Sequence, residues 1–282
     1  MRFYMMTDLE GVAGVTQWEN RADTGPYNTA RRQRLSRLLT GEVNAAVDGL
    51  IGAGFDDVIV NDGHGGGNTI DYDLADSRAV YYHGLERPFW LPFLDETCDA
   101  TGAVGAHSKA STPSGTLSHT MSEAVRRWSF NGIEVGETGL QALIAGYYGV
   151  PFVFAAGDIH LCREIEELCP GCVTVAVKQG TSMHSALTSA PARARELIRE
   201  GAMRAIEAVD RVEPLRLESP VVFRDERRDP TWDEEDPGEA TRVINAHVRE
   251  IEGEDLMDVL MKVYTHYDRN YRPEQWRPGV RE

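Results

Sequence analysis

The stretch Phe3-Tyr4-Met5-Met6-Thr7-Asp8-Leu9-Glu10 decides the fold, because an apolar run ends there in two acidic side chains. A short, continuous apolar run such as residues 3–6 is typical of a strand that is buried in a parallel sheet. Residues two apart on a strand project from the same face, so Asp8 and Glu10 are expected to reach one centre. The stretch therefore predicts a buried strand that delivers two carboxylates to one point.

Strand-like and helix-like segments alternate through the first 210 residues, which favours a mainly parallel sheet flanked by helices. The clearest helix is predicted from about Thr29 to Ala53, where apolar residues recur at three- and four-residue spacing. Other expected strands are 79–82, 102–106, 152–155 and 173–177, and other expected helices are about 136–148, 163–168 and 190–209. The predicted fold class is α/β.

The pattern changes from Arg211, where prolines interrupt the chain and residues 243–251 read as an antiparallel strand. We expect a metal-binding α/β domain over residues 1–210. A smaller α+β portion over residues 211–282 is expected to shape the substrate pocket or oligomer contacts. Eight acidic residues face two arginines between Asp225 and Glu239, with Pro230, Pro237 and Gly238 interleaved, and we interpret that segment as a solvated loop.

Composition narrows the class of protein. The 282 residues are 41% hydrophobic and 26% charged, which is ordinary for a soluble globular protein. No apolar run approaches the roughly 20 residues of a membrane helix, and no secretory signal opens the chain, so we expect a cytoplasmic protein. The formal charge of -16 would repel phosphate backbones and anionic lipid, so neither nucleic acid nor membrane is an expected partner.

Further candidate ligands follow other predicted strands. His64 comes after the apolar run 58–60 and His107 after residues 103–106, and open α/β sheets bind ligands at such carboxyl ends. Glu137 opens a predicted helix, where the helix dipole already favours a carboxylate. Each residue alone has an ordinary structural reading, but two neighbouring acids that face inward repel one another unless a proton or cation intervenes. Carboxylates with imidazoles suit zinc.

A second cluster has the spacing of a small zinc site, since His160, Cys162, Cys169 and Cys172 could supply four ligands. Zinc knuckles usually consist of two separated cysteine pairs, whereas a predicted helix links these residues. We therefore favour a helix end followed by a turn.

Five stretches together resemble the M55 metallopeptidases, a family of D-aminopeptidases. The matching stretches are Tyr4-Met5-Met6-Thr7-Asp8-Leu9-Glu10-Gly11, Asn61-Asp62-Gly63-His64, the segment from Gly105 to Pro113, Leu117-Ser118-His119-Thr120-Met121 and Gly136-Glu137-Thr138-Gly139. The resemblance covers at least residues 1–180. It implies a two-zinc hydrolase with five metal ligands and one catalytic histidine, namely Asp8, Glu10, His64, His107 and Glu137 as ligands and His119 as the catalytic residue.

The resemblance also implies a ring-like homo-oligomer, such as a decamer. We therefore expect a zinc-dependent amide hydrolase, most simply an aminopeptidase that releases N-terminal amino acids, D-amino acids included, from short peptides. Two zinc ions, bridged by a carboxylate such as Asp8, would lower the pKa of a bound water toward neutrality. Lys178 is a candidate for binding a substrate carboxylate, and its alternative reading is an ordinary surface lysine.

Other classes of function stay open at this point. The alternatives are a different two-metal amidohydrolase acting on N-acyl or amide compounds, a two-metal phosphoesterase and a non-catalytic metal-binding protein. A serine esterase lacks support because no Gly-x-Ser-x-Gly stretch occurs. A nucleotide-binding loop at residues 11–14 lacks the Gly-x-Gly spacing, and Asp8 and Glu10 would repel the pyrophosphate.

Overall fold

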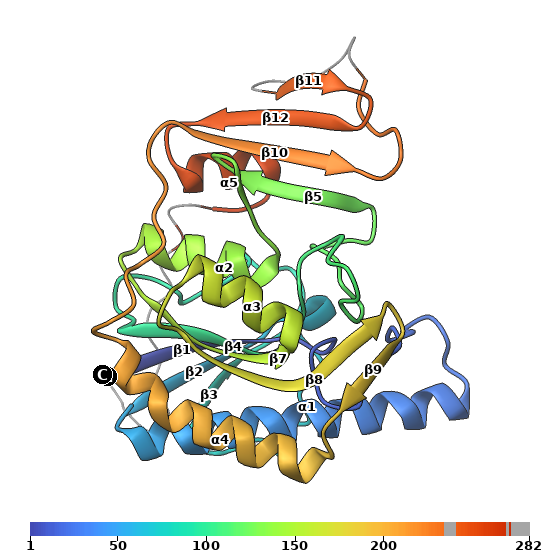
Figure 1. Ribbon diagram of the computed structural model, residues 1–282, viewed down its shortest axis with the longest axis vertical. Coiled ribbons are helices and arrows are strands. Elements are labelled where there is room, and N and C mark those ends of the chain that lie inside the picture. The colour runs from blue at the N-terminus through green and yellow to red at the C-terminus, as the bar shows by residue number, and fades with distance from the viewer. Residues whose placement is uncertain (234–240, 269–270, 272–282) are drawn as a thin grey trace.

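Two sheets with helices between them make up the structure, a computed structural model that describes residues 1–233, 241–268 and 271. Figure 1 shows the larger sheet in the lower half, with α1 and α4 beneath it and α2 and α3 above it. The smaller, antiparallel sheet lies beyond α2 and α5. Within the described residues, no helix is long and apolar enough to cross a membrane.

The larger sheet has seven strands, and all neighbours in it run parallel except the last pair. Strand β1 lies inside the sheet between β2 and β4, and all six of its residues are buried. This confirms the parallel, buried strand predicted from residues 3–6. In spatial order the strands are β3 (Val80–Tyr82), β2 (Asp57–Asp62), β1 (Arg2–Thr7), β4 (Ala100–Ala106), β7 (Phe152–Asp158), β8 (Val173–Ser182) and β9 (Ser185–Thr188).

Helices cover both faces of this sheet. Helices α1 (Pro26–Ala53) and α4 (Pro191–Ala208) pack against each other on one face. The apolar positions of α1 that recur at three- and four-residue spacing, Leu39 and Val43 among them, are fully buried. Gly49 permits the close approach, since a Cβ there would lie 2.7 Å from the Ala202 Cβ. The other face carries α2 (Glu137–Tyr147) and α3 (Ile159–Leu168).

The smaller sheet combines strands from distant parts of the chain. Its order is β11 (Thr241–Asn245), β12 (Val248–Gly253), β10 (Val221–Arg227), β5 (Val125–Phe130) and β6 (Ile133–Glu134), and α5 (Leu256–Val263) contacts β12 and β10. The single strand expected at 243–251 is therefore a two-strand hairpin. Strands β5 and β6 precede residue 210 but lie in the same sheet as β10, β11 and β12. The division into residues 1–210 and 211–282 stays a prediction.

The acidic segment after Asp225 is not a solvated loop throughout. Residues 225–227 belong to β10, and the Asp225 side chain is fully buried. It accepts a hydrogen bond from Trp128 Nε1 at 2.9 Å and pairs with Arg227 at 2.8 Å. A buried carboxylate needs such partners, and they come from strands that the local acidic composition does not reveal. Residues 234–240 lie outside the described residues.

Candidate metal centre

The candidate ligands gather at the carboxyl ends of β1, β2 and β4. After β1 the chain adds β2 and β3 on one side of that strand, and it then adds β4 and β7 on the other side. The strand order therefore reverses between β1 and β4. Open α/β sheets bind ligands at such a switch point. Asp8 and Glu10 follow β1, His64 follows β2 and His107 follows β4. The structure thus places these four residues at the strand ends from which the sequence expected them to converge.

The route by which Asp8 and Glu10 meet differs from the prediction. Strand β1 ends at Thr7, so the two carboxylates lie in the turn that follows, not on one face of a strand. Gly11 packs this turn against β4: its amide donates to the Gly105 carbonyl at 2.7 Å, and a Cβ at Gly11 would collide with the Ala106 backbone. The turn, and not the period of the strand, brings the acids together.

Three ligand atoms form a first group. His64 Nδ1 lies 3.0 Å from Asp8 Oδ1 and 3.0 Å from Glu10 Oε2. Both carboxylates are buried, and Glu10 Oε2 makes no contact of good hydrogen-bond geometry, its polar neighbour being His64 Nδ1. A buried carboxylate oxygen without a hydrogen bond is costly unless a cation faces it. Two oxygens and one nitrogen at this spacing fit a zinc ion.

A second group lies beside the first. His107 Nε2 and His119 Nε2 are each 3.5 Å from Glu137 Oε1, and the two rings stack at 4.1 Å. Glu137 is the first residue of α2, as predicted. The other oxygen of Asp8, Oδ2, lies 3.2 Å from His107 Nε2. Asp8 therefore spans both groups with its two oxygens.

The orientation of the two stacked histidines favours metal or proton chemistry at Nε2. His107 Nδ1 is 2.9 Å from the Ser108 carbonyl, and His119 Nδ1 is 2.9 Å from the Leu117 carbonyl. A carbonyl oxygen only accepts, so each Nδ1 carries the hydrogen and the lone pair of a neutral ring sits on Nε2. Both Nε2 atoms thus point toward Glu137, and each offers a lone pair when its ring is neutral.

The charges of the centre call for a cation. Burial alone would lower the pKa of His107, but Asp8 and Glu137 outweigh it and raise that pKa to about 10. Burial and then the neighbouring Asp8 charge raise the pKa of Glu10. For Asp8 the effect of burial is outweighed by His107 and His64, which hold its pKa well below its ordinary value. Protons on the imidazoles balance the carboxylates here, and divalent cations would take their place.

Lys178 has neither of the roles considered from sequence. It is buried rather than on the surface, and its Nζ donates to the Glu10 and Val15 carbonyls, at 2.7 Å in the case of Val15. These two bonds tie β8 to the turn that carries Asp8 and Glu10. The ammonium is therefore engaged by backbone rather than directed at a substrate carboxylate.

The cysteine cluster forms no ligand group. Cys162, Cys169 and Cys172 are buried and free, and the only two ligand groups among the described residues are those above. His160 Nε2 is instead 3.2 Å from the Gly180 carbonyl of β8. The helix and turn interpretation agrees with α3, which ends at Leu168.

Three residues around the centre were not found from the sequence. Glu19 Oε2 lies 3.2 Å from His64 Nε2, and the Trp18 and His119 rings form a T-shaped contact with their centroids 5.0 Å apart. Glu164, on α3, accepts hydrogen bonds from the amides of Lys109 at 2.8 Å and Gly136 at 3.1 Å. Glu164 thereby fixes the segments that carry His107 and Glu137. No periodic or motif signal marks these residues, because each contact joins segments far apart in sequence.

Glu42 lies under the same turn and gives a pH-dependent prediction. Its Oε1 accepts from the Ala13 amide at 2.9 Å while its buried Oε2 has no hydrogen bond, and burial raises its pKa from 4.5 to about 7. Between those pH values the unfolded chain releases this proton and the folded chain keeps it, so this residue costs stability as pH rises. Glu42→Gln stays neutral throughout. Its unfolding free energy relative to wild type should therefore rise by about 3 kcal/mol from pH 4.5 to 7.

Denaturant unfolding of both proteins in matched buffers at pH 4.5, 5.5, 6.5 and 7.5 measures this difference. Contributions common to both proteins cancel. A difference that stays constant across the series would contradict the assignment of the raised pKa to Glu42.

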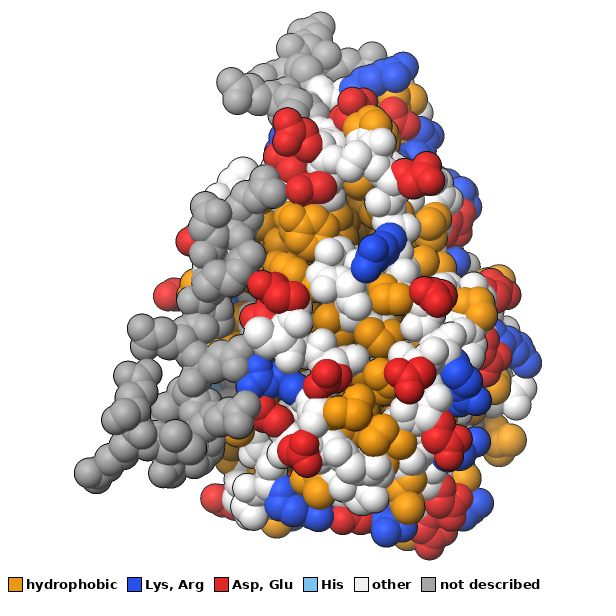
Figure 2. Space-filling view, turned by 90° about the vertical axis from the view of Figure 1, so that its left-hand side faces the viewer, with side chains coloured by type: hydrophobic (Ala, Val, Ile, Leu, Met, Phe, Trp, Pro, Cys, Tyr) orange, Lys and Arg blue, Asp and Glu red, His pale blue; other side chains and the backbone are white. Residues whose placement is uncertain are grey.

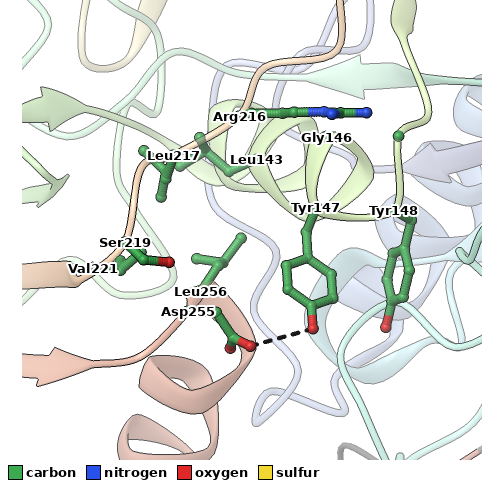
Figure 3. Close-up of a pocket in the computed structure, with 11 residues that line it drawn as sticks. Leu143, Gly146, Tyr147, Tyr148, Arg216, Leu217, Ser219, Val221, Asp255 and Leu256 are labelled. Atoms are coloured by element: carbon green, nitrogen blue, oxygen red, sulfur yellow. Dashed lines mark hydrogen bonds between the residues drawn. The ribbon is translucent and has the colours of Figure 1, made fainter.

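A cavity beside α2 lies away from this centre. A cavity of about 350 Å³ is lined by Tyr147 and Tyr148 at the carboxyl end of α2, with Arg216 and Asp255 (Figure 3). Glu137 is at the opposite end of this helix, which at 11 residues is about 15 Å long. The metal centre is thus separate from that cavity.

Figure 2 views the side of the molecule away from the carboxyl ends of β7 and β8. Acidic and basic side chains are interspersed among apolar ones on this side.

Comparison with known proteins agrees with this geometry. The profile of the Peptidase_M55 family, described as D-aminopeptidase, matches residues 1–232. A D-aminopeptidase of Bacillus subtilis (strain 168) is 37% identical over 216 residues, which are 76% of this chain and 77% of that protein. The solved structure of the Zn-dependent D-aminopeptidase DppA from Bacillus subtilis, a self-compartmentalizing protease, is 30% identical and superposes with a TM-score of 0.86. It covers 94% of this chain, and this chain covers 96% of it. The chain therefore belongs to the M55 peptidase family, the D-aminopeptidases.

Proposed function

We propose that this protein is a zinc-dependent aminopeptidase that releases the N-terminal residue of short peptides, with D-amino acids as its preferred class. The observation that carries the proposal is the placement of Asp8, whose two oxygens face two adjacent ligand groups. Asp8, Glu10 and His64 would hold one zinc ion, and Asp8, His107 and Glu137 the other. Family membership and the zinc dependence of the structural relative support the choice of metal.

This assignment gives each ion three protein ligands, which is the arrangement of catalytic zinc sites with an open position. His119 is then free for the reaction. Its side chain is 16% exposed, whereas that of His107 is 1% exposed, so of the two stacked histidines His119 is the one that a substrate can reach. We therefore assign His119 a catalytic role and not a ligand role.

The two ions, when bound, lower the pKa of a coordinated water and polarise the scissile carbonyl. The chain's own residues supply the remaining needs of amide hydrolysis. The hydrogen bond from His119 Nδ1 to the Leu117 carbonyl keeps Nε2 on the side of the ligand groups, where it can deliver a proton to the departing amine. Protonated at Nε2, the same ring can stabilise negative charge on the substrate oxygen. Trp18 packs against this ring in a T-shaped contact, with the ring centroids 5.0 Å apart.

The experiment is hydrolysis of D- and L-aminoacyl amides and dipeptides by the zinc-loaded protein, before and after removal of metal with a chelator. We expect release of D-amino acids, loss of release on chelation and its return with zinc. The matched control is the N-acetylated form of each substrate, which an aminopeptidase leaves intact and an amidohydrolase of N-acyl compounds cleaves. Full activity in a sample verified to be free of metal contradicts the proposal, as does cleavage of phosphate esters alone.

We also propose that the chain assembles into a ring-like homo-oligomer, such as a decamer. The structural relative is described as self-compartmentalizing, and Tyr27, Leu85 and Leu187 are large apolar side chains that are 84%, 69% and 73% exposed in the single chain. Such side chains fit contacts between subunits. Sedimentation velocity on the sample used for the assay gives the subunit number.

A further inference from the structure

Glu19 is held in one geometry beside the metal centre although it is not one of the ligands. It lies in the segment between β1 and α1, and its side chain is 8% exposed. Its Oε2 lies 2.6 Å from Arg21 Nε and 3.2 Å from His64 Nε2, and its Oε1 lies 3.0 Å from Arg32 Nε. Three partners thus fix both oxygens of this carboxylate.

The tautomer of His64 explains what this carboxylate does. His64 Nδ1 faces Asp8 Oδ1 and Glu10 Oε2, each at 3.0 Å, so Nδ1 is the atom placed to bind a cation with them. A ligating nitrogen must offer its lone pair, which puts the ring hydrogen on Nε2. Nε2 then donates to Glu19 Oε2. A carboxylate at the far nitrogen of a ligating histidine fixes its tautomer, aims its ring and raises its basicity.

The backbone on both sides of this contact is also tied together. Arg21, which pairs with Glu19, donates to the Gly65 carbonyl and, at 3.2 Å, to Thr69 Oγ1. The segment that carries Glu19 is therefore fastened to the segment that carries His64. A carboxylate anchored in this way can hold the imidazole in place before the metal arrives.

We propose that Glu19 is a positioning residue that accepts the hydrogen bond from His64 Nε2 and so holds Nδ1 toward the ligand group of Asp8 and Glu10. The proposal depends on the proposed function, because it presupposes that this group binds zinc. It predicts that one zinc ion of the pair, the one bound by His64, depends on Glu19.

The test measures zinc affinity by competition with a chromophoric chelator, in wild type, Glu19→Ala and Glu19→Gln. Glu19→Ala should weaken one of the two zinc-binding constants by about 10- to 100-fold and leave the other unchanged. Glu19→Gln keeps an oxygen that accepts from Nε2 and should lose less. Because the conservative variant separates loss of the acceptor from disruption of the loop, the test still decides if Glu19→Ala folds poorly.

A double-mutant cycle asks whether Glu19 acts through His64. His64→Ala and His64→Ala with Glu19→Ala should bind zinc equally, since the second change has no imidazole left to position. The matched loop control is Arg31→Ala. Arg31 donates to the Trp18 and Gln17 carbonyls at 3.1 and 3.0 Å and anchors the same loop without touching His64. It should bind zinc as wild type does.

Wild-type affinity in Glu19→Ala overturns the role of Glu19, provided that wild type binds two zinc ions. An equal loss of affinity in Arg31→Ala also overturns it, because the effect then belongs to the loop. So does an undiminished effect of Glu19→Ala in the His64→Ala background. A wild-type protein that binds no zinc is a different result: it overturns the proposed function, and this inference falls with it.

Discussion

Replacing Asp8 with alanine is expected to remove both zinc ions at once, because the two oxygens of this one carboxylate face both ligand groups. His64 and His107 would lose the acid they share, and each ion would keep only two protein ligands. Loss of the ions that generate the nucleophile removes several kcal/mol of stabilisation from the transition state, so kcat/KM should fall by more than about 10³-fold. Metal analysis by mass spectrometry after dialysis, together with the peptide assay, measures both effects.

Glu10→Ala is the matched control, since Glu10 contacts only the first group. It should weaken one ion and leave the second, bound through His107 and Glu137, in place. Asp8→Asn provides a second comparison, because it keeps the size of the side chain and one oxygen but removes the charge. Two tightly bound zinc ions in Asp8→Ala would show that Asp8 does not connect the groups and would remove the main support for the proposed function.

The central part of the fold could be predicted because its signal is local. The buried run at residues 3–6 and the apolar spacing in α1 follow from strand and helix periodicity alone. Strands β5 and β6 could not be found in this way, because β5 depends on pairing with β10, nearly 100 residues away. Burial of Asp225 has the same origin: its partner Trp128 is 97 residues away in sequence.

The candidate site was predictable where chemistry coincides with the ends of strands. His64 and His107 could be located because the carboxyl ends of parallel strands share one edge of the sheet. The prediction that Asp8 and Glu10 lie together was right, but its reason was wrong. A turn packed on β4 brings the two carboxylates together, not the two-residue period of a strand. Glu19 had no such signal, because it lies in an irregular segment and its bond to His64 spans 45 residues. Lys178 was misread because its role is set by two backbone carbonyls that only the folded chain brings to it.

The second large effect concerns His119, for which the geometry poses two alternatives. Its Nε2 is 3.5 Å from Glu137 Oε1, the same distance that separates His107 from that oxygen. Distance alone would thus allow His119 to be a ligand. Its greater exposure and its position at the edge of the centre favour a role in proton transfer or charge stabilisation.

We expect His119→Ala to retain two zinc ions and to lose about 10²- to 10⁴-fold in kcat, the contribution typical of a positioned acid or base. KM should change far less, because the loss falls on the transition state rather than on substrate binding. His184→Ala is the matched control, since the His184 ring also meets Trp18 edge-on, at 6.4 Å, but does not belong to either ligand group. It should retain most of kcat and both ions.

Metal content decides between the two roles. If His119→Ala binds only one zinc ion, His119 is a ligand of the second group and the catalytic assignment is wrong. If it binds two ions and turns over at the wild-type rate, His119 has neither role. Two ions with lost turnover would leave proton transfer or charge stabilisation at Nε2 as its function, because the Leu117 carbonyl already engages Nδ1 and only Nε2 faces the ligand groups. Substrates with better leaving groups should then recover part of the lost rate, since they need less help from an acid.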